Sequence, residues 1–453
     1  MTEEVKKSSI SRVREFCNGY PFYALQTLSA GLFVAFGREV EGALAFAMLI
    51  SLLLIVCEDI LPTTLPFLLL STFTTNCYDS FRTFMAFAPL AVVPILALIY
   101  HFVVYRKPLT IGKSAWGLLA VGVAVTLGGV GRYVLWEYVR SGYYVLGLGF
   151  GMLLVYCLLQ SQFSAVRGYD LRERFAVIMS LMGLLCLGMM AMGYLRYLEG
   201  LTAWPNMYGI SYNNVATLLM FAMPFGVYLG KKNRIGALLT VATYAGLCCS
   251  YSRGGLLFGS VEFLVCCIYW IADGKGKRGR IWRSAFCALG ACLILLLFGA
   301  RIWEVLVRRV FTEGAIEGSE RWRMIAQAFD RFIESPIFGT GIMDESISYG
   351  EYNKAGTMAW YHMMLPQIVG SMGALGIVAY TFQAIGRVRL IVTRPDRWAF
   401  CLGISYLGIF LMSQVNPGEF CPIPYGLLTA LLFVLQEIRL EKNTWIKGGL
   451  RKI

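Results

Sequence analysis

The sequence has few charged side chains. Asp, Glu, Lys and Arg make up 15% of its 453 residues, whereas soluble domains carry about 25%. Apolar residues make up 57%, and the mean hydropathy is +0.63. This composition leaves too little polar surface for a water-soluble globular fold, so it excludes that class and indicates a membrane protein.

Signatures of metal and nucleic-acid binding are also scarce. The chain has two histidines, and its thirteen cysteines include no CxxC spacing. There is no Asp-rich cluster that would hold a divalent cation, so we predict neither a cofactor nor an obligatory metal. The net charge is +13. Basic residues collect in the cytoplasmic loops of membrane proteins, so this charge is not a reason to expect nucleic-acid binding.

Long apolar runs are plentiful. A helix needs about 20 apolar residues to cross the hydrocarbon core, whereas a membrane barrel shows alternating segments of about ten residues. The continuous runs predict an all-α polytopic integral membrane protein with about 12–14 transmembrane helices. The predicted spans are residues 21–37, 41–57, 61–75, 83–104, 114–131, 139–160, 173–195, 210–230, 234–250, 254–273, 283–300, 364–386, 397–414 and 421–438.

The basic loops predict the orientation of these spans. Five of them are separated from one another by two spans each, so all five lie on the face that also holds both termini. The positive-inside rule makes this face cytoplasmic. These loops contain Arg106–Lys107, Arg167–Arg174, Lys231–Arg234, Lys275–Arg283 and Arg387–Arg397.

We divide the chain into four segments on this basis. Residues 1–200 form the N-terminal transmembrane helices, and residues 201–300 form further transmembrane helices that carry an arginine motif. Residues 301–362 form an extracytoplasmic loop, and residues 363–453 form the C-terminal transmembrane helices. The loop has about sixty residues, and loops of that length are commonly functional.

The loop contains a predicted amphipathic helix that starts after Ser319 and ends near Glu334. Arg321 breaks its pattern, because it projects from the apolar side near Ile325 and Ala328. A guanidinium on that side needs an anion or water. Two explanations are open: Arg321 binds an anionic ligand, or it reaches the interface or a glutamate. Arg323 falls on the polar side, where it is solvated.

Glycines and a histidine follow this helix. Gly339 and Gly341, separated by one residue, predict a tight turn with a close backbone approach. His362 stands at the mouth of the next span, where a neutral imidazole could accept a proton from a substrate hydroxyl. An incidental interfacial histidine is the alternative. The second histidine, His101, lies in an apolar span, and we interpret it as a packing residue.

A short turn joins two of the predicted spans. It contains Ser252, Arg253 and two glycines. The glycines would permit close approach of helices. An arginine at this boundary could anchor the span in the interface or bind an anionic ligand.

Together, these features resemble the O-antigen ligase and O-antigen polymerase family of bacterial membrane glycosyltransferases. The resemblance covers roughly residues 205–385. The family usually has Trp at the position of Ile325 and Asn at the position of Met363. The residues that carry the resemblance are Asn213, Asn214, Ala216 and Pro224, the segment 251–255, Arg321, Ile325 and Ala328, the segment 335–341, and His362, Leu365, Gly370, Gly373 and Gly376.

The resemblance implies a metal-independent glycosyltransferase with a GT-C-like fold. It would sit in the bacterial cytoplasmic (inner) membrane with an extracytoplasmic active site. The donor would be a glycan on undecaprenyl diphosphate, and the acceptor a glycan or a lipid-linked molecule. The implied catalytic residues are His362, Arg321 and Arg253, and the implied substrate-binding residues are Arg253, Arg321, Gly339, Gly341 and Asn213.

Two alternatives stay open from the sequence. A flippase for lipid-linked oligosaccharides would have a similar number of helices, but it should show repeats and charged residues at mid-membrane depth. Within the enzyme class, no motif separates a ligase from a polymerase, since the acceptor leaves no recognisable pattern. Sugar identity, stereochemistry and oligomeric state are equally unreadable.

Overall fold

The structure is a computed structural model, and in the part of the chain that it describes all regular secondary structure is helical. No strand occurs in these residues. The described residues are 3–76, 87–128, 145–166, 168–200, 212–230, 234–250, 252–303, 320–342, 361, 363–416 and 423–449. The all-α class predicted from the sequence is therefore confirmed.

The chain divides into two compact units, each made of two separate stretches of sequence. The first unit comprises residues 1–108 and 162–298. Within it, α10 packs against α2 and α11, and α11 packs against α12 and α13. Its helices are α1 (Glu3–Cys17), α2 (Tyr20–Ala35), α3 (Glu39–Val56), η1 (Leu61–Thr63), α4 (Thr64–Asn76), η2 (Ala88–Ala91), α6 (Val92–Val104), α10 (Leu171–Leu198), α11 (Tyr212–Leu229), α12 (Arg234–Cys249), α13 (Arg253–Ala272) and most of α14 (Gly276–Trp303).

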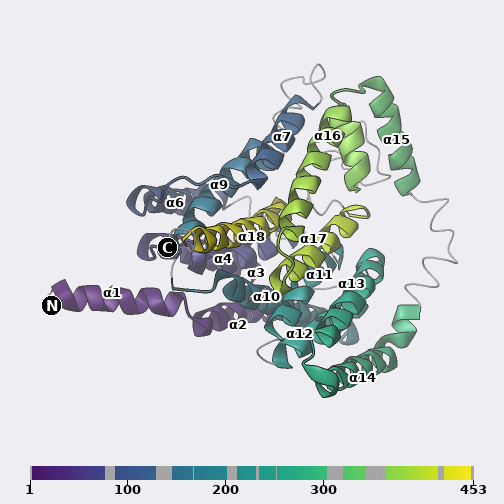
Figure 1. Ribbon diagram of the computed structural model, residues 1–453, viewed down its shortest axis with the longest axis horizontal. Coiled ribbons are helices and arrows are strands. Elements are labelled where there is room, and N and C mark those ends of the chain that lie inside the picture. Colours follow the sequence, from purple (N-terminus) through teal and green to yellow (C-terminus); the bar gives the residue numbers. More distant parts are fainter. Residues whose placement is uncertain are drawn as a thin grey trace. The chain divides into compact units, whose positions relative to one another are not determined.

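The second unit comprises residues 109–161 and 299–453. Its central element is α16, which packs against α7, α15, α17 and α18, and Figure 1 shows α15 beside it. The helices of this unit are α7 (Ser114–Leu127), most of α9 (Phe150–Ala165), α15 (Glu320–Glu334), α16 (Met364–Val392), α17 (Arg397–Ser413) and α18 (Ile423–Gly449).

Every predicted span overlaps one of these helices. Among the described residues, five helices are long and apolar enough to cross a membrane: residues 39–56, 171–198, 253–272, 276–300 and 364–392. A further seven apolar helices have 10–17 residues each. The protein is thus a multi-pass membrane protein.

A polar cluster closes the C-terminal end of α3. The last carbonyls of a helix have no partner within the helix, and here three side chains from elsewhere supply one. Arg14 Nε donates to the Val56 carbonyl (2.9 Å), Tyr105 Oη donates to the Ile55 carbonyl (3.0 Å), and His101 Nδ1 lies 2.9 Å from the Leu54 carbonyl. The arginine charge also suits the negative end of the helix dipole.

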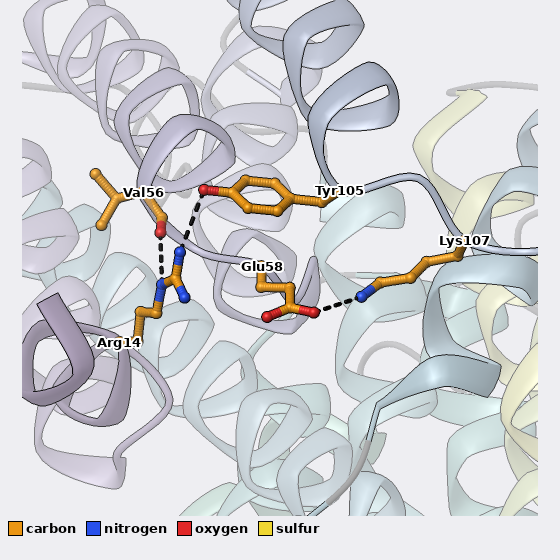
Figure 2. Close-up of polar contacts among 5 residues, drawn as sticks. All are labelled: Arg14, Val56, Glu58, Tyr105 and Lys107. Carbon is orange, nitrogen blue, oxygen red and sulfur yellow. Dashed lines mark hydrogen bonds and ion pairs between the residues drawn. The ribbon is translucent and has the colours of Figure 1, made fainter. Parts of the chain in front are cut away.

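Figure 2 shows the contacts of Arg14 with Val56 and Tyr105 and the nearby pair of Glu58 and Lys107. Two interpretations made from the sequence agree with this cluster. His101 is fully buried, which agrees with a packing role. Beside it, Lys107 pairs with Glu58 at 2.8 Å. Residues from α1, from the end of α3 and from the end of α6 therefore meet at one end of the first unit, as the predicted orientation requires.

A buried glutamate closes the N-terminal end of α7 in the second unit. Glu437 of α18 is 2% exposed. Its carboxylate accepts hydrogen bonds from the backbone nitrogens of Lys113 and Ser114 and from Tyr156 Oη. A carboxylate at the positive end of a helix is stabilised by the dipole and by these donors. These hydrogen bonds connect α18 and α9 to the N-terminal end of α7.

Candidate functional site

The first candidate site lies at the start of α13, in the first unit. Ser252 is the N-cap residue of this helix, and its Oγ accepts a hydrogen bond from the Gly255 backbone nitrogen at 3.0 Å. Such a cap satisfies one of the free N–H groups at a helix start. Arg253 is the first helical residue, and its side chain is exposed.

Asn213 joins this site from α11. Ser252 Oγ donates to Asn213 Oδ1 at 2.8 Å, and Ser252 itself is 1% exposed. The structure thereby brings together two of the residues predicted to bind substrate, Asn213 and Arg253, by way of Ser252. Sequence reasoning noted Ser252 only as part of a turn. A serine directly before an apolar helix is the usual signal of an N-cap and could have identified it.

The helices α11 and α13 run side by side from these ends. A Cβ atom added at Gly255 would meet Ala216, and one added at Gly259 would meet Met220 at 3.5 Å. Both contacts follow the same four-residue step, so the two helices are parallel and their N-terminal ends lie together. The close approach predicted for the glycines of this turn is therefore confirmed at Gly255.

The adjacent N-termini of α11 and α13 make this end of the first unit electrostatically positive. Each contributes roughly half a positive charge from its aligned peptide dipoles. The first turn of α13 contains no acidic residue, and neither does the first turn of α11. Arg253 adds a full positive charge, although a cation at a helix start is disfavoured. The N-terminal ends of helices favour phosphate groups.

The second candidate site lies on α15, in the second unit. This helix runs from Glu320 to Glu334, so the predicted helix is confirmed, and Ser319, its predicted N-cap, lies outside the described residues. Met324 and Ala328 are 0% and 2% exposed, and they form a buried cluster with Tyr361. They define the side of α15 that faces the protein.

Arg321 lies on this protein-facing side. It precedes Met324 by three residues, so the two side chains are neighbours on the helix surface. Arg321 Nη2 donates a hydrogen bond to the Val415 carbonyl at 2.9 Å. Both arginines are exposed, but Arg323 comes two positions later and therefore lies on another side of the helix. The different roles predicted for the two arginines stay a prediction.

Tyr361 ties the end of the long loop to α15 and α16. Its backbone nitrogen donates to Gln367 Oε1 at 3.1 Å, and Gln367 Nε2 donates to Ser371 Oγ at 2.7 Å. A Cβ atom at Gly370 would come within 2.6 Å of Tyr361 Oη, so the tyrosine packs directly on glycine backbone. His362 is the next residue, but it lies outside the described residues. Gln367 and Tyr361 were not identified from the sequence, because neither belongs to a recognisable motif.

The segment from Pro336 to Gly341 packs against a break in α16. Gly373 has φ 57° and ψ −150° and interrupts the helical conformation. On the N-terminal side of the break, the backbone nitrogens of Thr340 and Gly341 donate to the carbonyls of Gly370 (2.9 Å) and Ser371 (3.0 Å). On its C-terminal side, the backbone nitrogens of Ala374 and Leu375 donate to the carbonyls of Pro336 (2.8 Å) and Ile337 (3.1 Å). We call this set of contacts the clasp.

The clasp confirms the tight turn predicted for Gly339 and Gly341. Their φ angles are 69° and 98°, a region that favours glycine. A Cβ atom at Gly339 would collide with the backbone of Ser371 and Met372. The backbone nitrogen of Gly339 donates to the Ser335 carbonyl at 2.8 Å, and that of Gly341 takes part in the clasp. Their predicted part in substrate binding stays a prediction.

The described residues contain no group of three or more His, Cys, Asp or Glu side chains that could hold a metal ion. The acidic residues of the long loop, none of which its spacing singles out as a base in place of His362, also lie outside the described residues; they are Asp344, Glu345 and Glu351. Metal independence accordingly stays a prediction.

The fold and these two sites define a multi-pass helical membrane protein with arginines at the ends of its helices. Residues 237–381 match the family model described as O-antigen ligase. The match confirms the family resemblance found in the sequence, and it indicates a membrane glycosyltransferase of the O-antigen ligase or polymerase type. The matched segment includes Arg253, Arg321 and His362 but not Asn213. No curated protein and no solved structure gave a match.

Proposed function

We propose that this protein transfers a glycan from an undecaprenyl diphosphate carrier to an acceptor hydroxyl at the extracytoplasmic face of the bacterial cytoplasmic membrane. The acceptor is a glycan or a second lipid-linked molecule. The proposal rests on the N-terminal ends of the parallel helices α11 and α13, which lie together. Arg253 begins α13, and the first turn of neither helix contains an acidic residue. Such an end of a membrane protein suits a lipid-linked diphosphate.

Arg253 and Arg321 stabilise the leaving group in this proposal. As the bond between the anomeric carbon and the diphosphate oxygen breaks, negative charge develops on the diphosphate. A guanidinium offers two parallel N–H donors to phosphate oxygens. At a partly dehydrated membrane boundary such donors stabilise developing charge more than they would in water. The placement of Arg321 on the protein-facing side of α15, with its Val415 contact, supports this role.

His362 acts as the base. It takes the proton of the acceptor hydroxyl while the hydroxyl oxygen forms the new bond to the anomeric carbon, and the diphosphate departs with the electron pair. Support comes from its neighbour Tyr361, which is buried against Met324 and Ala328 of the helix that carries Arg321. Asn213 orients the start of α13 through Ser252 and, in this proposal, binds hydroxyls of the donor sugar.

The experiment is a transfer assay in lipid nanodiscs with a lipid-diphosphate-linked repeat unit. A ladder of longer glycans on the carrier identifies a polymerase, and a single transfer to an added acceptor identifies a ligase. The reaction is repeated with EDTA, which should not slow it. If the donor only moves to the other leaflet and no glycosidic bond forms, the alternative, a flippase, replaces the proposal.

A further inference from the structure

The exposed side of α15 carries a ridge of large apolar side chains. Trp322, Phe329 and Ile333 are 53%, 57% and 75% exposed, and Ile337 just beyond the helix is 60% exposed. The three helical residues fall within about 40° of one another on a helical wheel, since each residue advances by about 100°. We call these four residues the apolar ridge.

The helix has three sides in all. Met324 and Ala328 face the protein, and the apolar ridge lies to one side of them. Exposed polar side chains lie on the other side, among them Arg323, Asp330 and Glu334. A helix that only packed on protein would need one apolar side, and a helix in water would not keep a second apolar side exposed. The second apolar side therefore requires an apolar medium or partner.

The connections of α15 place it at the level where the spans end. Arg321 bonds to Val415, two residues beyond the end of α17 at Ser413. The segment after α15 enters the clasp at Gly370–Leu375 of α16. Arg389 marks the basic C-terminal end of α16. The segment from Val369 to Arg389 has about twenty residues, which is the length of one membrane crossing. The clasp thus sits at the membrane boundary opposite that basic end.

A helix at this level can lie flat in the interface. Tryptophan favours that region because its ring is apolar and its N–H is polar. Helices with one charged and one bulky apolar side lie there with the apolar side 5–10 Å into the boundary between headgroups and acyl chains. The three sides of α15 match this arrangement: protein, acyl chains and water.

We propose that α15 is an interfacial helix whose apolar ridge inserts among the acyl chains of the bilayer lipids at the ends of the spans. This insertion fixes the depth of Arg321 at the level of lipid phosphates. The consequence for Arg321 rests on the proposed function, because a carrier diphosphate lies at the same depth. A second copy of the chain on the ridge is a different outcome, which the experiment separates.

Fluorescence quenching tests the position of the ridge without any need for activity. The full chain is reconstituted in nanodiscs with acyl-brominated phosphatidylcholine, and W322F provides the background. In that background, Phe329→Trp places an indole on the ridge, and Asp330→Trp places one on the polar side a single residue away. The signal of each is the difference from W322F.

We expect brominated lipid to quench the F329W indole and aqueous acrylamide to quench the D330W indole. Acrylamide quenching of both to the same degree would put the ridge in water and overturn the proposal. If neither quencher reaches the F329W indole, protein covers the ridge, which also overturns it. A monodisperse elution profile confirms that each variant is folded.

Activity then tests the consequence for Arg321. We expect Phe329→Ser and Ile333→Ser to lower kcat/KM for the bilayer-embedded donor at least fivefold, because each removes apolar area from the acyl chains. Asp330→Ser should change it less than twofold. If the wild type shows no transfer, the proposed function fails while the quenching result still decides the position of α15. Equal effects of all three substitutions would refute the depth argument.

Discussion

The two arginines of α15 differ in the direction of their side chains, and we expect this difference to determine which of them is needed for glycan transfer. Arg321 and Arg323 have the same charge and lie on different sides of the same helix, and Arg321 donates to the Val415 carbonyl. Periodicity predicted this difference from the sequence, because each position advances by a fixed angle. The sequence could not predict the Val415 contact, since Val415 is distant in the chain and its acceptor is a backbone carbonyl.

Arg321→Ala should lower the rate of glycan transfer at least a hundredfold, since losing a charge-assisted bidentate contact costs roughly 3 kcal/mol or more in a low-dielectric site. Arg323→Ala should lower it less than threefold. The comparison is made on initial rates in nanodiscs, with expression and thermal unfolding checked for both. Equal losses would mean that the sides of α15 do not determine function.

The Ser252 cap gives a second prediction at this scale. Asn213→Ala removes the acceptor that holds Ser252 Oγ, so the start of α13 should lose about 1 kcal/mol of stability. Donor affinity should fall with it, because Arg253 is the next residue. Thermal unfolding and donor titration measure the two effects.

A matched control is Ser51→Ala on α3, which removes a hydroxyl that bonds to the Ala47 carbonyl of its own helix at 2.9 Å. It should leave donor affinity unchanged. Full affinity in Asn213→Ala would show that the Ser252 contact does not position Arg253.

Among the elements, α16 departs most from its sequence prediction. Residues 364–386 were expected to form one continuous span, and the structure has a break at Gly373. A hydropathy window averages over such a break, since the residues on both sides are apolar. The glycines at 370, 373 and 376 were recognised only through their spacing. Neither their hydrogen bonds nor their partner segment could be read from that spacing.

Gly373→Ala tests the clasp. The conformation at Gly373 is almost restricted to glycine, and a Cβ atom there would lie 2.7–2.8 Å from Pro336 O and Gly339 N. We expect a loss of stability of at least about 2 kcal/mol and a strong loss of transfer.

Gly386→Ala in the same helix is the control, because nothing lies within 4 Å of the added atom. It should be neutral or slightly stabilising, as expected from helix propensity. Thermal unfolding of both variants gives the comparison. Equal melting temperatures for the two would contradict the clasp.

The contact between the end of α3 and the residues after α6 predicts a pH effect. The hydrogen bond and charge of Lys107 hold the pKa of Glu58 below its usual value. A depressed pKa stabilises the fold above the unfolded pKa of about 4.3, and the stabilisation is lost as pH falls through the lower folded value. Because Glu58 is 55% exposed, the contribution should stay below about 1 kcal/mol.

We therefore expect Glu58→Gln to be slightly less stable than the wild type at pH 7 and to approach it below about pH 4. Thermal unfolding across this pH range measures the difference. Glu15→Gln, at an exposed position on α1, is the control and should match the wild type at pH 7. A Glu58→Gln difference that grew on acidification would have the wrong sign for this contact.

At the scale of the whole molecule, hydropathy determined most of the fold. The helices, their order and the class of protein followed from apolar runs, because a membrane leaves few other structures for such runs. The division into two units, each made of two separate stretches of sequence, could not be predicted from hydropathy, because it depends on which helices pack together. Asn213 and Ser252 illustrate this limit: 39 residues separate them, and only the packing of α11 on α13 joins them.

The central proposal is that Arg253 and Arg321 each bind phosphate of the lipid-linked donor. The most direct measurement is the donor affinity of the wild type, R253A and R321A in nanodiscs, with R323A as the control. We predict that R253A and R321A each weaken binding at least tenfold and that R323A binds like the wild type. Full affinity in R253A or R321A, or an equal loss in R323A, would contradict the account.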